Sequence, residues 1–259
     1  MPELSHEQFF DWLRSRQPSQ SLTQDMVDGS KELLAYLTPE ALITILTKIN
    51  SQPPANSKTA LSKEPLSRAD ITKAANALGV EPAKLKAVID VECPNHGFDD
   101  EGRPVILFEP HIFYKYLTRV NIITKRDQLQ ALFPDIVNRT WDRSLYKVRP
   151  SYQKLQVAEV LDWDAAHMAC SWGRGQVMGF NYESLGYPSL RAFVAAMHES
   201  EAAQLDAMCR YIKVNGLVDE LKRGDWAGFA LGYNGEGYAE NRYDIKLANA
   251  YQAAKRQGW

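Results

Sequence analysis

Two acidic residues stand at positions where their apolar neighbours favour a core residue. Glu92 ends the stretch "EPAKLKAVIDVE", and Glu109 follows the apolar run Val105–Phe108. A carboxyl group surrounded by apolar side chains keeps its proton to a higher pH, because desolvation disfavours the anion. Near neutral pH such a group can act as a general acid, for example toward a glycosidic oxygen. A second carboxyl would add a group that orients water or stabilises positive charge on a sugar ring.

A helix predicted from Pro82 to Glu92 must position the first of these acids. Helical spacing places Glu92 on the same face as three apolar residues, so its carboxyl faces a core or a cleft. Pro94 cannot continue the helical hydrogen bonds, so the helix ends at or just after Glu92. The negative end of the helix dipole then raises the pKa of the carboxyl further. The three apolar residues are Leu85, Val88 and Ile89.

Each acid also has a structural interpretation. Glu92 would then be a surface acid at a helix end, or half of an ion pair with Lys86 or Arg103. Glu109 would cap the helix that follows Pro110, with its carboxylate near free backbone N–H groups. Three further acids rival Glu109 as the second carboxylate, although turn formation accounts for them. They are Asp99, Asp100 and Glu101.

The composition is that of an ordinary globular protein. With 259 residues, of which 45% are hydrophobic, the chain can bury the cores of a small and a large domain. A net charge of -2 gives no global reason to expect nucleic acid or an anionic membrane as partner. The N-terminus lacks the pattern of a signal peptide, and no apolar run is long enough to span a membrane. We therefore expect no membrane insertion and interpret the three cysteines as reduced.

Turn residues divide the chain into two mainly helical parts and a linker. Residues 1–50 predict three short helices, the first opened by a capping box of Ser5 and Gln8 and the third by Thr38-Pro39-Glu40. Residues 51–67, rich in Pro, Ser and Asn, predict a linker. Residues 68–259 predict a mainly α domain with one small β hairpin over 97–108. Its predicted helices begin at Asp70 and Pro82 and then cover 188–214, 217–223, 225–232 and 241–255.

Five separated blocks carry a family resemblance. They are "VE" (91–92), "GF" (97–98), "GRPVILFEPHIFY" (102–114), "SWGRGQVMGFNY" (171–182) and "YNG" (233–235). In this order, over about residues 68–259, they resemble the N-acetylmuramidase domain of bacteriophage endolysins. The resemblance implies a lysozyme-like α+β domain that hydrolyses the β-1,4 bond between N-acetylmuramic acid and N-acetylglucosamine in peptidoglycan. It places Glu92 at the position of the general acid and Glu109 at the acid of the "ILFE-x-H" block.

The same resemblance implies six residues that bind substrate or line the cleft. The Gln176 amide can donate and accept hydrogen bonds toward a sugar or its N-acetyl group, and Trp172 offers a flat face for stacking. In the structural alternative, Met178 belongs to the core and Asn234-Gly235 forms a turn. The chain departs from the family after the general acid, where Cys93-Pro94-Asn95-His96 replaces small residues. The six residues are Ser171, Trp172, Gln176, Met178, Tyr233 and Asn234.

Three alternatives stay open from the sequence. A lytic transglycosylase would use Glu92 alone and form an anhydro sugar without water. A zinc-binding wall-interaction module would use two residue pairs at zinc-like spacing, Cys93 with His96 and His167 with Cys170. A thiol enzyme would use Cys93 with a histidine. We expect no cofactor and no metal, and the residues do not separate a retaining from an inverting route.

The resemblance also implies where the protein acts. A phage product without a signal peptide would accumulate in the cytoplasm of the bacterial host and reach the periplasm and cell wall through a lesion made by a holin. A secretion-system effector with the same domain is also compatible with the sequence. The N-terminal helical domain would bind peptidoglycan, as modules before a catalytic domain often do in such endolysins. We expect a monomer whose partner is bacterial peptidoglycan.

Overall fold

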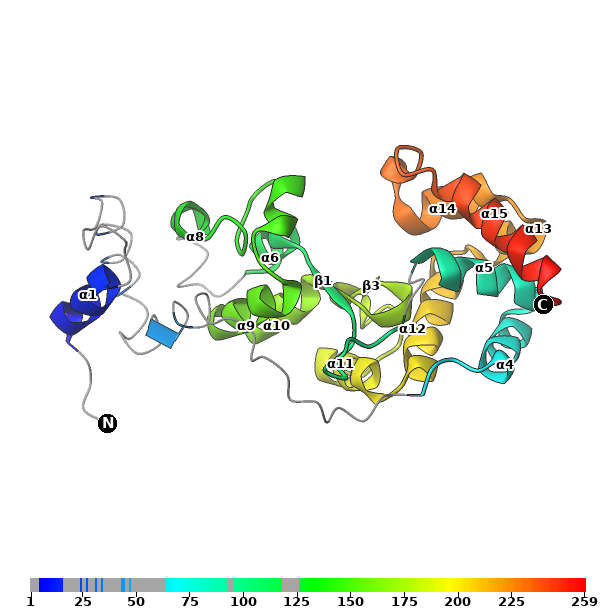
Figure 1. The fold of residues 1–259 in the computed structure, drawn as a ribbon, viewed down its shortest axis with the longest axis horizontal. Coiled ribbons are helices and arrows are strands. Elements are labelled where there is room, and N and C mark those ends of the chain that lie inside the picture. Colours follow the sequence, from blue (N-terminus) through cyan, green and yellow to red (C-terminus); the bar gives the residue numbers. More distant parts are fainter. Residues whose placement is uncertain are drawn as a thin grey trace. The chain divides into compact units, whose positions relative to one another are not determined.

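Figure 1 shows a computed structural model of the chain, which describes residues 5–15, 64–92, 96–117 and 126–259 and seven single residues between 24 and 47. The chain divides into two compact units. Unit 1 contains residues 1–55 and 108–170, and unit 2 contains residues 56–107 and 171–259. Both units bury apolar side chains in a core of their own.

Unit 1 begins with α1 (His6–Ser15). The backbone N–H of Ser5 donates to Oε1 of Gln8 at 2.8 Å, and the N–H of Gln8 donates to the Ser5 hydroxyl at 3.2 Å. This reciprocal pair satisfies two N–H groups at the start of the helix and confirms the predicted capping box. Thr38-Pro39-Glu40, the predicted start of another helix, lies outside the described residues.

The described part of residues 108–170 is a group of short helices. α10 packs against α6 and α9, and its buried Ala165 and Ala166 allow a close approach of the helices. Phe113 of α6 is fully buried in the same core. The helices are α6 (Pro110–Tyr116), α8 (Arg126–Leu132), the 3-10 helix η1 (Arg143–Lys147), α9 (Ser151–Leu161) and α10 (Trp163–Met168).

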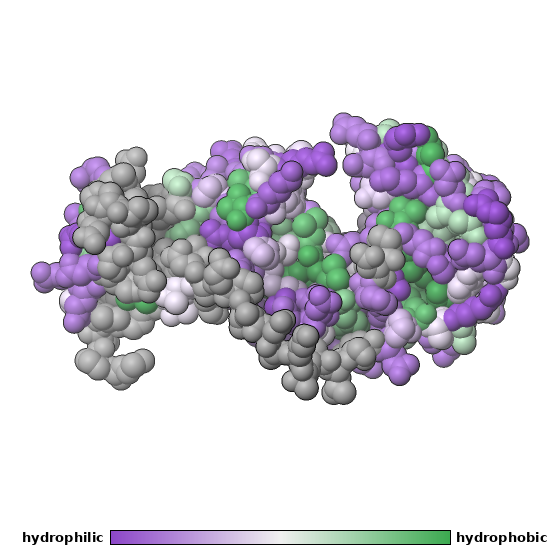
Figure 2. All heavy atoms as spheres, in the orientation of Figure 1, coloured by the Kyte–Doolittle hydropathy of each residue, from purple (hydrophilic) through white to green (hydrophobic). Residues whose placement is uncertain are grey.

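Unit 2 is built around α5, which packs along α15 and against α4 (Figure 1). The apolar face of α5 is fully buried, as its spacing predicts, and each such side chain contributes roughly 1.5–3 kcal/mol by leaving water. Figure 2 shows mostly hydrophilic residues along the outer surface of α13 and α15, so these helices turn their apolar faces inward. The helices are α4 (Arg68–Leu78), α5 (Pro82–Glu92), α11 (Leu190–Glu199), α12 (Glu201–Val214), α13 (Val218–Arg223), α14 (Trp226–Asn234) and α15 (Tyr243–Arg256).

Two predicted helix boundaries were wrong, and serine caps explain both. α4 starts at Arg68 and is capped by Ser67, whose hydroxyl accepts from the N–H of Asp70, so Asp70 is the third helical residue instead of the cap. The helix predicted over 188–214 is two helices, because Ser200 is extended at φ −163°. The Ser200 hydroxyl accepts from the N–H of Ala203 at 3.1 Å and thereby starts α12.

A small sheet of order β1-β2-β3 completes the fold. β2 (Cys170–Trp172) and β3 (Val177–Met178) form an antiparallel hairpin that pairs Ser171 with Met178 and Trp172 with Val177. β1 (Ile106–Phe108) lies at the end of the predicted 97–108 hairpin. That segment forms the predicted turn, in which the N–H of Gly102 donates to the carbonyl of Asp99 at 2.9 Å. Only one bridge joins its arms, from Phe98 to Pro104. The described residues are therefore mainly helical, with a small β hairpin, as predicted.

Candidate active site

Glu92 is the last residue of α5 and is half-buried. Nδ2 of Asn234 donates a hydrogen bond to its Oε1 at 3.0 Å. The helical spacing thus places the carboxyl at the end of a buried face, as the sequence predicts. The apolar residues of this face, Leu85, Val88 and Ile89, are at most 1% exposed.

The basic residues that the ion-pair interpretation assigned to Glu92 have other partners. Lys86 pairs with Asp90 at 2.5 Å, one helical turn along α5. Arg103 pairs with Asp99 at 2.7 Å. Glu92 is therefore held by a neutral amide, which orients its carboxyl without fixing it as an anion.

The surroundings of Glu92 favour its protonated form. Burial raises the pKa of Glu92 from its ordinary value of 4.5 to about 7, against the hydrogen bond from Asn234 and the positive charge of Lys246. At neutral pH roughly half of the molecules therefore carry a proton on Glu92. The geometry supplies a proton donor at a pH where an exposed glutamate is ionised.

Asn234 is itself held by the packing of α14. The hydroxyl of the preceding Tyr233 donates to the carbonyl of Gly175 at 2.8 Å. The Tyr233 ring stacks on Phe229 with centroids 5.4 Å apart and meets Tyr211 edge-on at 5.1 Å. Oδ1 of Asn234 is buried and has no hydrogen-bond partner among the described residues. One end of this amide therefore orients Glu92, and the other end is an unsatisfied acceptor.

The turn after Trp172 holds two more of the predicted residues. The Ser171 hydroxyl donates to Oε1 of Gln176 at 2.9 Å, and Nε2 of Gln176 donates to the carbonyl of Gly173 at 2.9 Å. Gln176 has a left-handed backbone, with φ 46°. The side chains of Ser171 and Gln176 thus stabilise the 173–175 turn. The carbonyl of Gly175 in this turn accepts the hydrogen bond from Tyr233.

Glu109 lies in unit 1, between β1 and α6, and is half-buried. It occupies the N-cap position of α6, as the capping interpretation predicts, but its carboxylate makes no capping hydrogen bond. Instead, the hydroxyl of Tyr146 donates to Oε2, and Nδ1 of His111 lies 3.4 Å from the same atom. Burial raises the pKa of Glu109, against the hydrogen bond from Tyr146 and the positive charge of Lys154. Both predicted acids are thus partly desolvated carboxyls.

Comparison with known proteins decides the family. The sequence matches the N-acetylmuramidase family model over residues 81–255, which includes Glu92, Glu109 and Asn234. The chain belongs to the N-acetylmuramidase family. The muramidase is also similar to the crystal structure of the endolysin of Burkholderia phage AP3, with a TM-score of 0.63 and 32% sequence identity over 90% of this chain and 96% of that one. A search of curated proteins finds no match.

Family membership makes this muramidase a glycoside hydrolase that acts on peptidoglycan. This conclusion agrees with the resemblance carried by the five sequence blocks. No helix among the described residues is long and apolar enough to cross a membrane.

One predicted site residue of the muramidase does not fit its role. Trp172 is 1% exposed, so a pyranose cannot reach its indole face. The ring packs in unit 2 near His198, with centroids 6.1 Å apart. An isolated tryptophan between polar and glycine residues suggested a stacking surface, but β2 turns it into the core. Met178 of β3, by contrast, is half-buried and outside the fully buried core.

The acids of the 99–102 turn serve the turn, as their spacing indicates. Oδ1 of Asp99 accepts from the backbone N–H groups of Glu101 and Arg103 at 3.0 and 2.9 Å. Arg103 also pairs with both carboxylates. Asp99 and Glu101 therefore belong to a local ion-pair network, and Asp100 is exposed.

The residues of the zinc alternative have separate surroundings. Nδ1 of His167 lies 2.9 Å from the carbonyl of Trp163, and the Cys170 thiol donates to the carbonyl of Ala166 at 3.5 Å. His96 is exposed, and Cys93 lies outside the described residues. Among the residues that the structure describes, no three or more His, Cys, Asp or Glu side chains form a group that could hold a metal ion.

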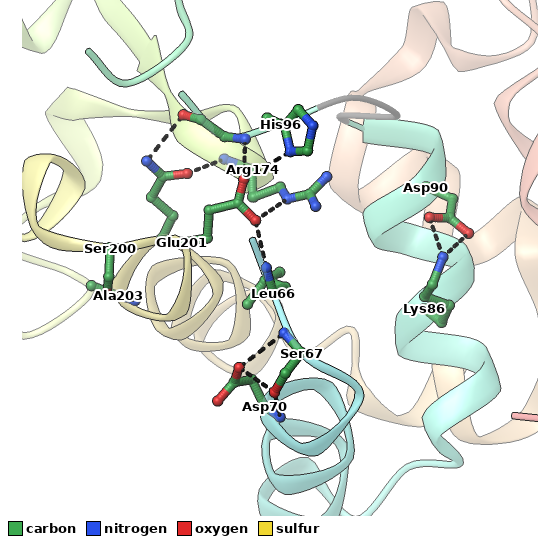
Figure 3. A network of polar contacts seen from close by, with 12 residues as sticks. Leu66, Ser67, Asp70, Lys86, Asp90, His96, Arg174, Ser200, Glu201 and Ala203 are labelled. Carbon is green, nitrogen blue, oxygen red and sulfur yellow. Dashed lines mark hydrogen bonds and ion pairs between the residues drawn. The ribbon is translucent and has the colours of Figure 1, made fainter. Parts of the chain in front are cut away.

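Sequence reasoning missed a buried polar cluster beside the site (Figure 3). Glu201, at 1% exposed, pairs with Nε of Arg174 at 3.2 Å and accepts from the backbone N–H of Leu66 at 2.8 Å. Gln204, one helical turn later, is equally buried. The signal was the spacing of Glu201 and Gln204 directly after Ser200, which marks a helix start with polar groups on one face.

A cavity of about 410 Å³ lies between α4 and α12. Asp70, Lys73, Asp206 and Arg210 supply charged groups to its wall, and Cys209 lies among them. Burial raises the pKa of the Cys209 thiol to about 12, so this cysteine stays protonated and unreactive. None of the predicted site residues lines this cavity, which separates it from the surroundings of Glu92.

Proposed function

We propose that this muramidase hydrolyses the β-1,4 bond between N-acetylmuramic acid and N-acetylglucosamine with Glu92 as the general acid. The observation that carries the proposal is a half-buried carboxyl with a pKa of about 7, held by Asn234. Because the amide of Asn234 donates to Oε1, the carboxyl proton resides on Oε2 and is available to the leaving oxygen. General-acid catalysis of this kind contributes roughly 10²–10⁴-fold to the rate.

Asn234 is proposed to contact both Glu92 and the substrate. Its buried Oδ1 has no protein partner among the described residues, and such an acceptor is costly unless a ligand or water satisfies it. An N-acetyl N–H or a sugar hydroxyl supplies the matching donor. Ser171, Gln176 and Tyr233 then support the site through the turn that anchors α14, and Met178 lines the cleft.

Glu109 is proposed as the assisting carboxylate that orients water or stabilises positive charge on the sugar ring. Its burial, its raised pKa and its hydrogen bond from Tyr146 support a constrained acid with a tuned proton affinity. The acids of the 99–102 turn serve that turn instead, through the hydrogen bonds of Asp99 and the ion pairs of Arg103. In this mechanism Glu109 must be ionised while Glu92 is protonated. The rate of cleavage therefore depends on the pKa values of both residues.

The products test hydrolysis directly. Mass analysis of muropeptides released from purified peptidoglycan is expected to find reducing sugars that carry the mass of one added water. A lytic transglycosylase using Glu92 alone would release anhydro-muramyl products that lack this water. Finding only anhydro products would therefore contradict hydrolysis and indicate a lytic transglycosylase. It would leave the proposal that Glu92 donates the proton unchanged. The anomeric form of the first product separates a retaining from an inverting route.

We further propose that residues 1–50 form a peptidoglycan-binding domain joined by residues 51–67 to the catalytic domain, residues 68–259. The support is the helical pattern of the N-terminus and the linker composition. Cosedimentation with purified peptidoglycan should recover Glu92→Gln protein more completely than the same variant lacking residues 1–50. Circular dichroism shows whether the truncated chain is folded. Equal recovery of two folded proteins would contradict wall binding by this segment.

The proposed setting is phage lysis. The muramidase would act as a monomer on the peptidoglycan of its bacterial host after a holin opens the way from the cytoplasm. The similarity to a phage endolysin supports this setting. A secretion-system effector is the alternative, and the genes that flank the coding sequence discriminate between the two.

A further inference from the structure

One turn of α12 holds two segments of unit 2 that lead to the proposed general acid. Oε1 of Glu201 accepts from the backbone N–H of Gly97 at 2.5 Å. Nε2 of Gln204 donates to the carbonyl of the same Gly97 at 3.1 Å. Both backbone polar groups of Gly97, which follows Glu92 by five residues, are therefore bound to α12.

The second segment is the 173–175 turn. Oε1 of Gln204 accepts from the backbone N–H of Arg174 at 3.0 Å, and Oε2 of Glu201 accepts from its Nε at 3.2 Å. Figure 3 shows Arg174, His96 and Leu66 directed toward Glu201. The next residue of the turn, Gly175, accepts the Tyr233 hydroxyl. The position of Arg174 is thus transmitted to the end of α14, where Asn234 binds Glu92.

Glycines allow both segments to approach α12 closely. A Cβ added at Gly97 would overlap the amide of Gln204, and one added at Gly173 would lie 2.5 Å from Cδ of the same residue. A Cβ on Gly175 would lie 2.8 Å from Cβ of Met208. At such distances something must shift: the side chain of Gln204 at Gly97 and Gly173, and the turn or α12 at Gly175. The glycines of the "SWGRGQ" block therefore serve packing against this helix.

We propose that Glu201 and Gln204 are positioning residues of the muramidase, which fix Glu92 and Asn234 relative to each other through Gly97 and the 173–175 turn. Neither residue touches the reacting atoms. Both carboxylate oxygens of Glu201 accept hydrogen bonds, one from Gly97 and the other from Leu66 and Arg174. A carboxylate can satisfy all three donors, because it is acceptor-only on both oxygens.

Glu201→Gln tests the proposal, which rests on the assignment of Glu92 as general acid. An amide offers one oxygen, so its NH₂ group must face either Gly97 or the Leu66 and Arg174 donors. We expect kcat on purified peptidoglycan to fall about tenfold or more, because small displacements of catalytic groups have large kinetic effects. KM should change less than kcat, because Asn234 is the only proposed substrate contact that the substitution displaces.

The pH profile separates positioning from other roles. Glu92 is surrounded by Asn234 of α14, by Lys246 and Tyr243 of α15 and by other tyrosines whose pKa values are raised, so these tyrosines stay neutral. The hydrogen bond from Asn234 lowers the pKa of Glu92. Loosening this bond in Glu201→Gln should move the alkaline limb of kcat to higher pH. Loss of a nearby negative charge alone would move it to lower pH.

Two further variants complete the test. Asp206→Asn makes the same change of acid to amide on an exposed position of α12, and it should keep the wild-type kcat and pH profile. Gly97→Ala disturbs the contact with α12 while leaving Glu201 intact, and it should reproduce the kinetic changes of Glu201→Gln. Thermal unfolding shows whether Glu201→Gln is folded. If it is not, the kinetics of Gly97→Ala test the proposal instead.

The outcomes are distinct. Folded Glu201→Gln and Gly97→Ala proteins that match Asp206→Asn in kcat and alkaline limb would overturn the positioning role. A limb that moves to lower pH in Glu201→Gln would also overturn it. An active Glu92→Gln protein would instead remove the catalytic assignment itself, whatever the effect at Glu201.

Discussion

Glu92→Gln is expected to lower kcat on peptidoglycan by roughly 10²–10⁴-fold, the usual contribution of a general acid. The substitution keeps the size and the hydrogen bond from Asn234 to the side-chain oxygen, but an amide has no proton to give to the leaving oxygen. KM should change little, because the shape of the site is preserved. The rate of release of soluble muropeptides from purified sacculi measures the effect.

Asp90→Asn is the matched control for this substitution. Asp90 lies two residues before Glu92 on the same helix and pairs with Lys86 at 2.5 Å. This half-exposed ion pair contributes little to stability, so the control should retain wild-type activity. Equal activity of Glu92→Gln and Asp90→Asn would show that another group donates the proton. Glu109→Gln should lower kcat less than Glu92→Gln if Glu109 only assists.

The rate of glycan cleavage is expected to fall about tenfold per pH unit above pH 7, so that at pH 9 it is about a hundredfold lower. The sign follows from the role of Glu92: the active form is protonated, and burial places its pKa at about 7. Below this pH the limb depends on Glu109, whose raised pKa moves the acid limb upward from that of an ordinary glutamate. The profile of kcat should therefore be bell-shaped, with an acid limb above that of an ordinary glutamate.

Asn234→Leu provides a directional control for the pH profile. It removes the hydrogen bond that lowers the pKa of Glu92, so the alkaline limb should move to higher pH. Both enzymes are assayed on peptidoglycan with the same stem peptide, so that ionisation of the substrate affects the two pH profiles equally. A profile that is flat from pH 7 to pH 9 in the wild type would contradict a general acid with this pKa.

The placement of Glu92 was predictable because local rules agree there. Helical spacing from Leu85 to Glu92 assigns the buried face, and Pro94 assigns the helix end. The capping box of Ser5 and Gln8 is equally local. Each of these features depends on residues within about two helical turns, which a single sequence displays directly.

The remaining site depends on contacts between distant segments. Nothing near Asn234 indicates that its amide meets Glu92, 142 residues earlier. The contact of Glu201 with Gly97 spans 104 residues. Burial of Trp172 follows from the pairing of β2 with β3, and strands this short give no clear pattern in the sequence. The family resemblance named some of these residues, but it did not assign their partners.

Titration of Glu92 by ¹³C NMR, in protein labelled at the glutamate carboxyl carbons and assigned with Glu92→Gln, measures the central property directly. The account predicts that the resonance missing from the variant titrates with a pKa of about 7 in the wild type. A midpoint near the ordinary value of 4.5 would mean that Glu92 is ionised at neutral pH, and it would contradict the assignment of this residue as the proton donor.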